Sequence, residues 1–258
     1  MNMIPRDPTA FKKIDVHSHL IPGVDDGCRS LEESLACARM LVAAGYSHTF
    51  CTPHVWPSLP DNTIAAVIAR RTHELQQALD AVGIHLTLLP GGEINLRPDT
   101  ADTAPHDLIT YALAGKHVLI DLWAEKLPPF FDPAIRRLQS LGLTVILAHP
   151  ERMRAVQDNP ALADHFGDLG LLLQGNLECL SHAPSTLTFR TAYQFLTENR
   201  YFMLGTDLHN LPSLPPRLQG LHRAEMLVGP ETLQRLTEEN PRQLLPAPAF
   251  SEWLTPPT

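Results

Sequence analysis

Seven short apolar runs recur along this chain of 258 residues, and helical patterns fill the intervals between them. The runs span residues 13–19, 47–54, 86–94, 117–123, 143–149, 171–177 and 201–207. They are rich in valine, isoleucine, leucine and threonine, and glycines or prolines punctuate them, which is typical of β-strands. Strands that alternate with helices indicate a parallel sheet with right-handed crossovers. The pattern therefore predicts an α/β fold.

The helical segments have recognisable ends. Ser30 and Glu33 form a capping-box pattern at the start of a helix that runs to about Ala44 and stops at Gly45. A second helix covers 62–82, where apolar residues recur at helical spacing. Further helices fit residues 133–141, 160–168, 185–199, 217–228 and 230–238, and 95–116 forms a long, partly irregular connection.

Seven or eight strand–helix units can close into a (β/α) barrel, and an open doubly wound sheet is the rival fold. Periodicity alone does not separate the two. Candidate ligands scattered over many strand ends favour closure, because a ring of strand ends converges on one axis. We expect one barrel domain over residues 1–258, with an N-terminal extension (1–12) and a proline-rich tail (246–258).

Composition excludes several classes of function. The formal net charge of −8 argues against general nucleic-acid binding. No Cys-x-x-Cys pair is present among four cysteines, which favours reduced thiols in a cytoplasmic protein. The N-terminus has no signal-peptide pattern, and no apolar run is long enough to insert into a membrane.

Histidine or an acidic residue lies at the downstream end of six of the seven runs. Residues i and i+2 of a strand share a face, so His17 and His19 can reach one metal ion. The complete candidate set is His17, His19, Asp26, His54, Glu93, Asp121, His149, Asp207 and His209. Each has a simpler explanation alone: Asp25-Asp26-Gly27 suits a turn, for example. Their joint placement is much harder to explain without a common site.

Nine candidates exceed the three or four ligands of a single zinc ion, so the set indicates two or three divalent ions. Mixed imidazole and carboxylate ligands favour manganese, iron or zinc over magnesium or calcium alone. Of these metals we expect manganese. A bridging carboxylate such as Glu93 suits a hydrolytic site in which bound water ionises near neutral pH.

Several motifs occur in one order over most of the chain. They are His17-x-His19, Asp25-Asp26-Gly27, Thr52-Pro53-His54, Gly92-Glu93-Ile94, Ala148-His149-Pro150-Glu151-Arg152, Thr206-Asp207-x-His209-Asn210-Leu211 and Asn240-Pro241-Arg242. This set resembles the polymerase and histidinol phosphatase (PHP) superfamily. It is most similar to the bacterial metal-dependent phosphotyrosine-protein phosphatases of capsule and exopolysaccharide gene clusters.

The resemblance implies a distorted, TIM-like (β/α)7 barrel with a trinuclear metal site. By this resemblance His17, His19, Glu93 and Asp207 hold the first ion, Glu93, Asp121 and His149 the second, and Asp26, His54 and His209 the third. Arg152 would bind the substrate phosphate, although a surface arginine at a helix start is the simpler alternative.

Three departures from the pattern of similar phosphatases stand out. Asp121 occupies a position that is commonly glutamate, so one methylene is missing. Ser213-Leu214 replaces a Gly-Arg pair, and Arg217 would take over phosphate binding only if its loop turns inward. Val55-Trp56-Pro57 is apolar where a basic or polar segment is common, which indicates an aromatic partner or a different phosphoester.

The leading hypothesis is a metal-dependent phosphomonoesterase that acts on protein phosphotyrosine, with Arg152, Asp207 and His209 as catalytic residues. Asp207, His209 and Asp26 are alternative general acids. The expected partner, by resemblance, is a membrane-anchored tyrosine kinase that controls polysaccharide synthesis. The alternatives are a small-molecule phosphatase, acting on histidinol phosphate or a nucleotide, and a regulatory module with structural metals.

Other hydrolase classes fit less well. No cysteine has an arginine six positions later, which excludes the Cys-x5-Arg phosphatases. Amidohydrolase barrels also begin with His-x-His, but they usually carry a metal-bridging lysine after a middle strand, where this chain has Asp121.

Overall fold

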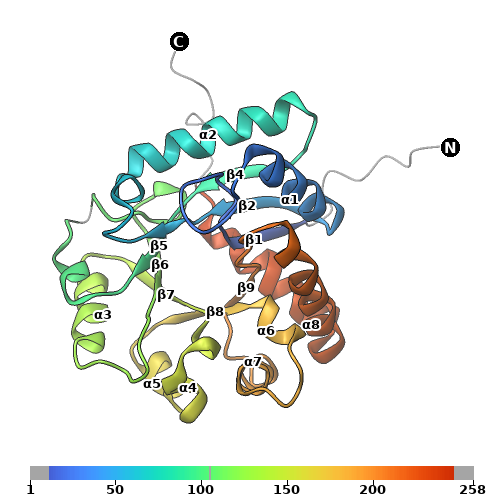
Figure 1. Ribbon diagram of the computed structural model, residues 1–258. Helices are drawn as coiled ribbons and strands as arrows, with labels where there is room; N and C mark the ends of the chain where they lie inside the picture. The colour runs from blue at the N-terminus through green and yellow to red at the C-terminus, as the bar shows by residue number, and fades with distance from the viewer. Residues whose placement is uncertain (1–11, 105, 247–258) are drawn as a thin grey trace.

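The computed structural model describes residues 12–104 and 106–246 (Figure 1). Apart from Lys12 and Pro246, the expected N-terminal extension and proline-rich tail lie outside the described residues. That both segments form one domain with the barrel stays a prediction.

The strands of the described residues are all parallel and form two sheets. The first sheet has the order β1 (Lys13–Ser18), β2 (Tyr46–Cys51) and β4 (Thr87–Pro90). The second has the order β3 (His54–Val55), β5 (Glu93–Asn95), β6 (His117–Asp121), β7 (Thr144–Ala148), β8 (Leu172–Asn176) and β9 (Met203–Gly205). Both sheets therefore consist of the predicted runs.

Short interruptions divide two of the predicted strands, and the ladder continues across them. Thr52 N donates to Ser18 O (2.8 Å), and Glu93 N donates to Pro53 O (3.0 Å), so β3 continues β2. Gly91 and Gly92 separate β4 from β5, and a Cβ on Gly92 would lie 2.7 Å from Val55 Cγ2. Only glycine allows this close approach.

The barrel closes where the last strand meets the first. Asp207 N donates to His17 O, and His19 N donates to Leu208 O, each at 2.7 Å. A parallel bridge joins Ser18 to Leu208. The predicted distorted α/β barrel is confirmed, and the open doubly wound sheet is excluded.

Helices surround the curled sheet (Figure 1). They are α1 (Leu31–Ala43), α2 (Ala65–Ala81), α3 (Phe131–Ser140), α4 (Arg154–Asp158), α5 (Leu162–Asp168), α6 (Leu177–Ser181), α7 (Leu187–Thr197) and α8 (Leu214–Gln234). Short 3₁₀ turns cover Pro60–Thr63, Pro98–Asp102, Tyr111–Leu113, Pro150–Arg152, Leu211–Ser213 and Pro241–Leu244, and a π turn covers Arg235–Glu239. No helix of residues 12–104 and 106–246 has the length and apolar character needed to cross a bilayer.

Local sequence signals account for most helix ends. Ser30 caps α1 by accepting from Glu33 N at 3.3 Å, as predicted. The predicted break between helices 217–228 and 230–238 is confirmed: Gly229 is non-helical (φ 79°, ψ 165°) and separates two helical stretches within α8, the second of which continues into the π turn Arg235–Glu239. The short helices α4 and α6 were not predicted, since five residues are too few for a clear period.

The apolar core supports the site from the amino-terminal side of the strands. One cluster packs the helices on the sheet, and a smaller one joins β1, β2, β6, β7 and β9 through residues such as Val16, Leu119 and Ile146. These residues precede the site residues of the same strands, so the polar groups lie beyond an apolar floor. Tyr111 anchors this floor by donating its hydroxyl to Val16 O at 2.9 Å.

Candidate metal centre

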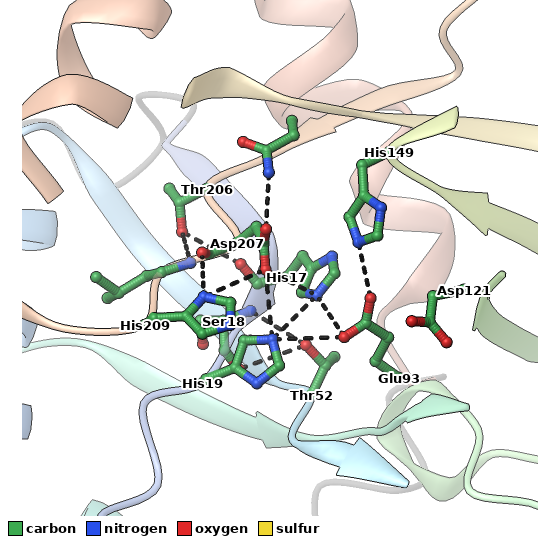
Figure 2. A network of polar contacts seen from close by, with 12 residues as sticks. His17, Ser18, His19, Thr52, Glu93, Asp121, His149, Thr206, Asp207 and His209 are labelled. Carbon is green, nitrogen blue, oxygen red and sulfur yellow. Dashed lines mark hydrogen bonds and ion pairs between the residues drawn. The ribbon is translucent and has the colours of Figure 1, made fainter. Parts of the chain in front are cut away.

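The nine predicted ligands meet at the carboxyl ends of the strands, and Figure 2 shows all of them except Asp26 and His54. They form four overlapping groups of donor atoms, each within 4.8 Å: His19/Asp26/His54/His209, His17/His149/Asp207, His17/His19/Glu93 and His54/Glu93/Asp121. All are buried except Asp26 and His209. The structure brings the whole predicted set into one connected cluster.

Five distances among four of these atoms match the edge length of a tetrahedral ligand set. His17 Nε2 lies 3.3 Å from His19 Nε2, 3.4 Å from Glu93 Oε2 and 3.3 Å from Asp207 Oδ1. His19 Nε2 lies 3.6 Å from Glu93 Oε2 and 3.4 Å from Asp207 Oδ1. Ligand atoms that bind one ion at about 2.0–2.2 Å in a tetrahedron are about 3.3–3.6 Å apart. These side chains therefore fit a cation between them.

Glu93 occupies the middle of the cluster. Its Oε1 is 2.8 Å from His149 Nε2 (Figure 2), and its Oε2 is 2.8 Å from His54 Nδ1. The second contact lacks hydrogen-bond geometry, so Glu93 Oε2 and His54 Nδ1 are both buried without a hydrogen bond. Burial alone would raise the pKa of Glu93, but the charge of His17 and the hydrogen bond from His149 hold this pKa well below 4.5. A buried, ionised carboxylate with an unsatisfied oxygen suits a bridging ligand.

The solvent-facing side of the cluster is formed by Asp26, His54 and His209. Asp26 Oδ1 lies 3.3 Å from His54 Nε2 and 3.5 Å from His209 Nε2. The Asp26 side chain is 59% exposed, whereas that of His209 is 20% exposed. This group is the one that solvent or a substrate reaches first.

Asp121 lies at the opposite edge, beside His54 and Glu93. Its carboxylate accepts from Asn95 Nδ2 at 3.2 Å and from the indole N–H of Trp123. Burial and the neighbouring Glu93 charge raise the pKa of Asp121 to about 7. Two carboxylates this close ionise together only with a compensating cation, which agrees with a metal site.

Three histidines have their tautomer defined by a partner outside the cluster. His17 Nδ1 is 2.8 Å from Gln174 Oε1, His19 Nδ1 is 2.7 Å from Asp25 Oδ2, and His209 Nδ1 is 2.8 Å from the Asp207 carbonyl oxygen. Each Nδ1 therefore carries the hydrogen and donates it. In the neutral imidazole that binds metal, each Nε2 therefore turns a lone pair inward, which is the usual arrangement of metal-binding histidines.

Sequence reasoning missed these outer partners. Asp25 also accepts from His54 N (2.9 Å) and Gly27 N (3.0 Å), so it connects two ligand loops. Burial would raise the pKa of Asp25, but His19 and these hydrogen bonds lower it to about 2. Gln174 and Asn176 lie at the end of β8, the one predicted strand without a candidate ligand. Their i, i+2 polar spacing was the available signal.

Asp207 connects the cluster to an arginine. Its Oδ2 accepts from Arg152 Nη1 at 2.8 Å and from Asn176 Nδ2 at 2.7 Å. Burial would raise the pKa of Asp207, but the nearby His17, His19 and His149 hold it below its usual range. The Arg152 side chain remains 43% exposed, so it can contact a bound anion.

Arg217 does not replace a phosphate-binding arginine. Its side chain is buried and donates to the carbonyl oxygens of Thr206 (2.7 Å) and Asp207 (2.9 Å), and it pairs with Glu178 at 3.0 Å. The loop does not turn inward to present it. Arg217 supports the backbone of Asp207, which adopts a left-handed conformation with φ 51°.

These features define a class: a parallel α/β barrel with a buried histidine–carboxylate cluster suited to several divalent cations. The chain belongs to the family described as "Capsular polysaccharide synthesis, CpsB/CapC", whose profile matches residues 13–246.

Relatives and solved structures agree with this membership. The tyrosine-protein phosphatase YwqE of Bacillus subtilis is 28% identical over 227 residues, which are 87% of this chain and 89% of the relative. The tyrosine-protein phosphatase CpsB of Streptococcus agalactiae is 27% identical over 244 residues, with 90% and 98% covered. A chain from the crystal structures of YwqE from B. subtilis and CpsB from Streptococcus pneumoniae, described as metal-dependent tyrosine phosphatases, superposes with a TM-score of 0.79. It is 25% identical and covers 86% of this chain and 90% of its own length.

More distant barrels share the fold alone. A D-hydantoinase structure superposes with a TM-score of 0.53 at 11% identity, over 94% of this chain and 72% of its own.

Proposed function

We propose that this protein is a metal-dependent protein-tyrosine phosphatase. The observation that carries the proposal is that His17 Nε2 and His19 Nε2 lie 3.3 Å apart and each within 3.6 Å of Glu93 Oε2 and Asp207 Oδ1. The exposed guanidinium of Arg152 lies directly beside this group. A cation site next to an arginine suits a phosphate ester. Family membership and the names of the relatives support the same activity.

Two or three divalent cations would occupy the cluster. Manganese is the expected metal, and iron, zinc and magnesium are the alternatives. The proposed ligand sets remain those given by resemblance, and His19 is added to the set of Asp26, His54 and His209, because it lies within the same group of donor atoms. When bound, the ions would ionise a water molecule near neutral pH and offset charge on the phosphoryl oxygens.

The protein's own residues would orient the ester. Arg152 would donate to a phosphoryl oxygen, while Asp207 holds its Nη1 and thereby directs the guanidinium. Asn176 donates a second hydrogen bond to the same carboxylate oxygen, so the Asp207 side chain has little freedom to turn. Binding therefore depends on a rigid support as well as on charge.

The proton for the leaving phenolate would come from the solvent-facing side of the cluster, where Asp26 and His209 lie. Asp207 is an unsuitable acid, because its carboxylate is buried, accepts two hydrogen bonds and has a lowered pKa. Asp26 and His209 face solvent at 3.5 Å from each other. We assign the proton to this pair or to a water molecule that it holds.

The natural substrate would be phosphotyrosine on a protein that controls polysaccharide synthesis. A membrane-anchored tyrosine kinase, acting with the phosphatase on the cytoplasmic side, is the proposed partner. The description of the family as one of capsular polysaccharide synthesis supports this assignment.

Elemental analysis and a substrate screen on the same preparation test the proposal. We expect at least two equivalents of divalent metal per chain and hydrolysis of a phosphotyrosyl peptide, with a higher kcat/KM than for histidinol phosphate. Preference for histidinol phosphate would favour the small-molecule phosphatase. A metal-loaded protein that hydrolyses no phosphate ester with added Mn, Fe, Zn or Mg would favour the regulatory module.

A further inference from the structure

Two tryptophans, each two positions after a candidate ligand, meet at the mouth of the site. Trp56 follows His54 and stacks on its ring, with 4.0 Å between centroids and an interplanar angle of 19°. Trp123 follows Asp121 and donates its indole N–H to that carboxylate. The two indoles contact each other edge to face at 6.3 Å and 90°. Segments far apart in sequence thus build one aromatic corner.

Trp123 faces a pocket that is continuous with the candidate metal centre. The pocket has a volume of about 390 Å³, and its lining includes Trp123, Glu125, His149, Arg152 and Met153. His149 and Arg152 belong to the site described above, so the pocket begins where a phosphate would bind. Its volume lies in the range of small-molecule sites, about 300–1,000 Å³.

We propose that Trp123, backed by Trp56, forms an aromatic wall that contacts the phenyl ring of the substrate and selects aryl over alkyl phosphates. This inference rests on the phosphatase proposed above. The ring of a phosphotyrosine is attached to phosphorus through a single oxygen. When Arg152 binds the phosphate, the ring must therefore lie among the first side chains of the same pocket.

The orientation of Trp123 distinguishes it from an ordinary surface residue. It is 67% exposed, and isolated exposed apolar side chains need no functional explanation. Here the indole is held at one end by Asp121 and at its side by Trp56. A fixed, exposed aromatic face loses little entropy on contact with a ligand.

Inhibition by non-hydrolysable phosphonates isolates this contact from catalysis. Phenylphosphonate and ethylphosphonate present similar charge to Arg152 and differ in the aromatic ring. For the metal-loaded wild type we expect a lower inhibition constant for phenylphosphonate. The selectivity is the inhibition constant of ethylphosphonate divided by that of phenylphosphonate. Trp123→Leu should reduce this ratio by about two- to tenfold, which corresponds to the range of aromatic-pair energies. Ethylphosphonate inhibition should not change.

Trp123→Phe separates the aromatic face from the bond to Asp121. Phenylalanine cannot donate to the carboxylate, but it keeps an aromatic ring. Trp123→Phe should therefore preserve most of the selectivity for phenylphosphonate. Trp56→Leu should give a smaller loss than Trp123→Leu, because Trp56 supports the wall from behind. Tyr193→Leu, which removes an exposed aromatic ring on α7, is the matched control and should leave the ratio unchanged.

Equal inhibition constants for both phosphonates in the wild type, or an unchanged ratio in Trp123→Leu with wild-type metal content, would overturn the aromatic wall. Either result leaves the proposed phosphatase intact if phosphotyrosyl peptides are still hydrolysed. Absence of hydrolysis in the metal-loaded wild type would instead count against the proposed function. If phenylphosphonate still inhibits more strongly and Trp123→Leu lowers the ratio, the wall stands as an aryl-binding element.

Discussion

Arg152 Nη1 lies 2.8 Å from Asp207 Oδ2, although 55 positions separate the two residues in the chain. The pair joins a candidate phosphate-binding group to a carboxylate of the candidate metal centre. A change in either residue should therefore have separable effects on substrate binding and metal content.

Substitution of Arg152 should weaken substrate binding and leave the metals in place. We expect Arg152→Met to raise KM for phosphate esters by about tenfold or more, the value of a charge-assisted hydrogen bond. Arg152→Lys should lie between Arg152→Met and wild type, because it keeps the charge but not the planar donor geometry. Steady-state kinetics with metal analysis provides the measurement. Unchanged KM in both variants would make Arg152 a surface residue.

Glu93 should be required for metal retention. Glu93→Gln keeps the size of the side chain but removes the charge that faces four histidines and would bridge two ions. We expect loss of at least one metal equivalent per chain together with phosphatase activity, while circular dichroism shows a folded protein. A Glu93→Gln variant with full metal content and turnover would remove Glu93 from the ligand set.

Asp25 should act on metal affinity without being a ligand. Asp25→Asn weakens the acceptor for His19 Nδ1, so the imidazole is a poorer and less well oriented donor. Outer partners of this kind change metal affinity by about 10–100-fold, and we expect a reduction in this range by competition with a chelator. Asp158→Asn, an exposed acid on α4, is the control. Equal affinities in the two variants would contradict the assignment.

Arg217 should contribute to stability rather than to substrate binding. Arg217→Met leaves buried carbonyl oxygens of Thr206 and Asp207 without a donor, and we expect the free energy of unfolding to fall by about 2–4 kcal/mol. Arg71→Met, on the exposed face of α2, should change it by less than about 0.5 kcal/mol. Urea unfolding measures both. A large rise in KM without destabilisation would instead return Arg217 to the phosphate site.

Metal loading should release protons. In the metal-free protein burial alone would lower the pKa of His17 and His19, but Glu93, Asp207 and Asp25 raise both above 6.5. Metal binding needs neutral imidazoles, so loading at pH 7 should release protons and affinity should fall as the pH decreases. Calorimetry in buffers of different ionisation enthalpy measures this release.

The same shifts set the pH dependence of the metal-free fold. A histidine whose pKa is raised on folding stabilises the protein fully below its unfolded value of 6.5, and this contribution is lost as the pH rises through the folded pKa. We therefore expect the metal-free protein to lose thermal stability as the pH rises above about 6.5, and bound metal to restore this stability. No proton release and no loss of stability would show that these imidazoles are neutral without metal.

The candidate ligands were predictable because each has a local signature. His17 and His19 share a strand face, and Asp121 and Asp207 lie in apolar runs where an unpaired carboxylate is unfavourable. Their placement at strand ends also favoured a closed barrel, and the bonds between β9 and β1 confirm the closure. Outer residues such as Gln174 have only a weak signature, the i, i+2 polar spacing with Asn176, because an amide at the end of a strand satisfies many environments.

Backbone conformation and the choice among arginines required the tertiary structure. His149 (φ 34°) and Asp207 (φ 51°) adopt left-handed conformations that cost about 1–3 kcal/mol each. No sequence pattern predicts these conformations. Arg152 and Arg217 both follow site motifs, yet one reaches the cluster and the other is buried against backbone carbonyls. Only packing across the barrel distinguishes them.

The sequence by itself determined the order of strands and helices, the family and the set of candidate ligands, because these depend on local periodicity and on residue type at strand ends. The tertiary structure decided which donor atoms lie within 4 Å of one another, which histidine nitrogen faces inward and which arginine remains open to a phosphate. Those properties arise from contacts between segments far apart in the chain, where side-chain packing selects one arrangement from many that the same residues allow.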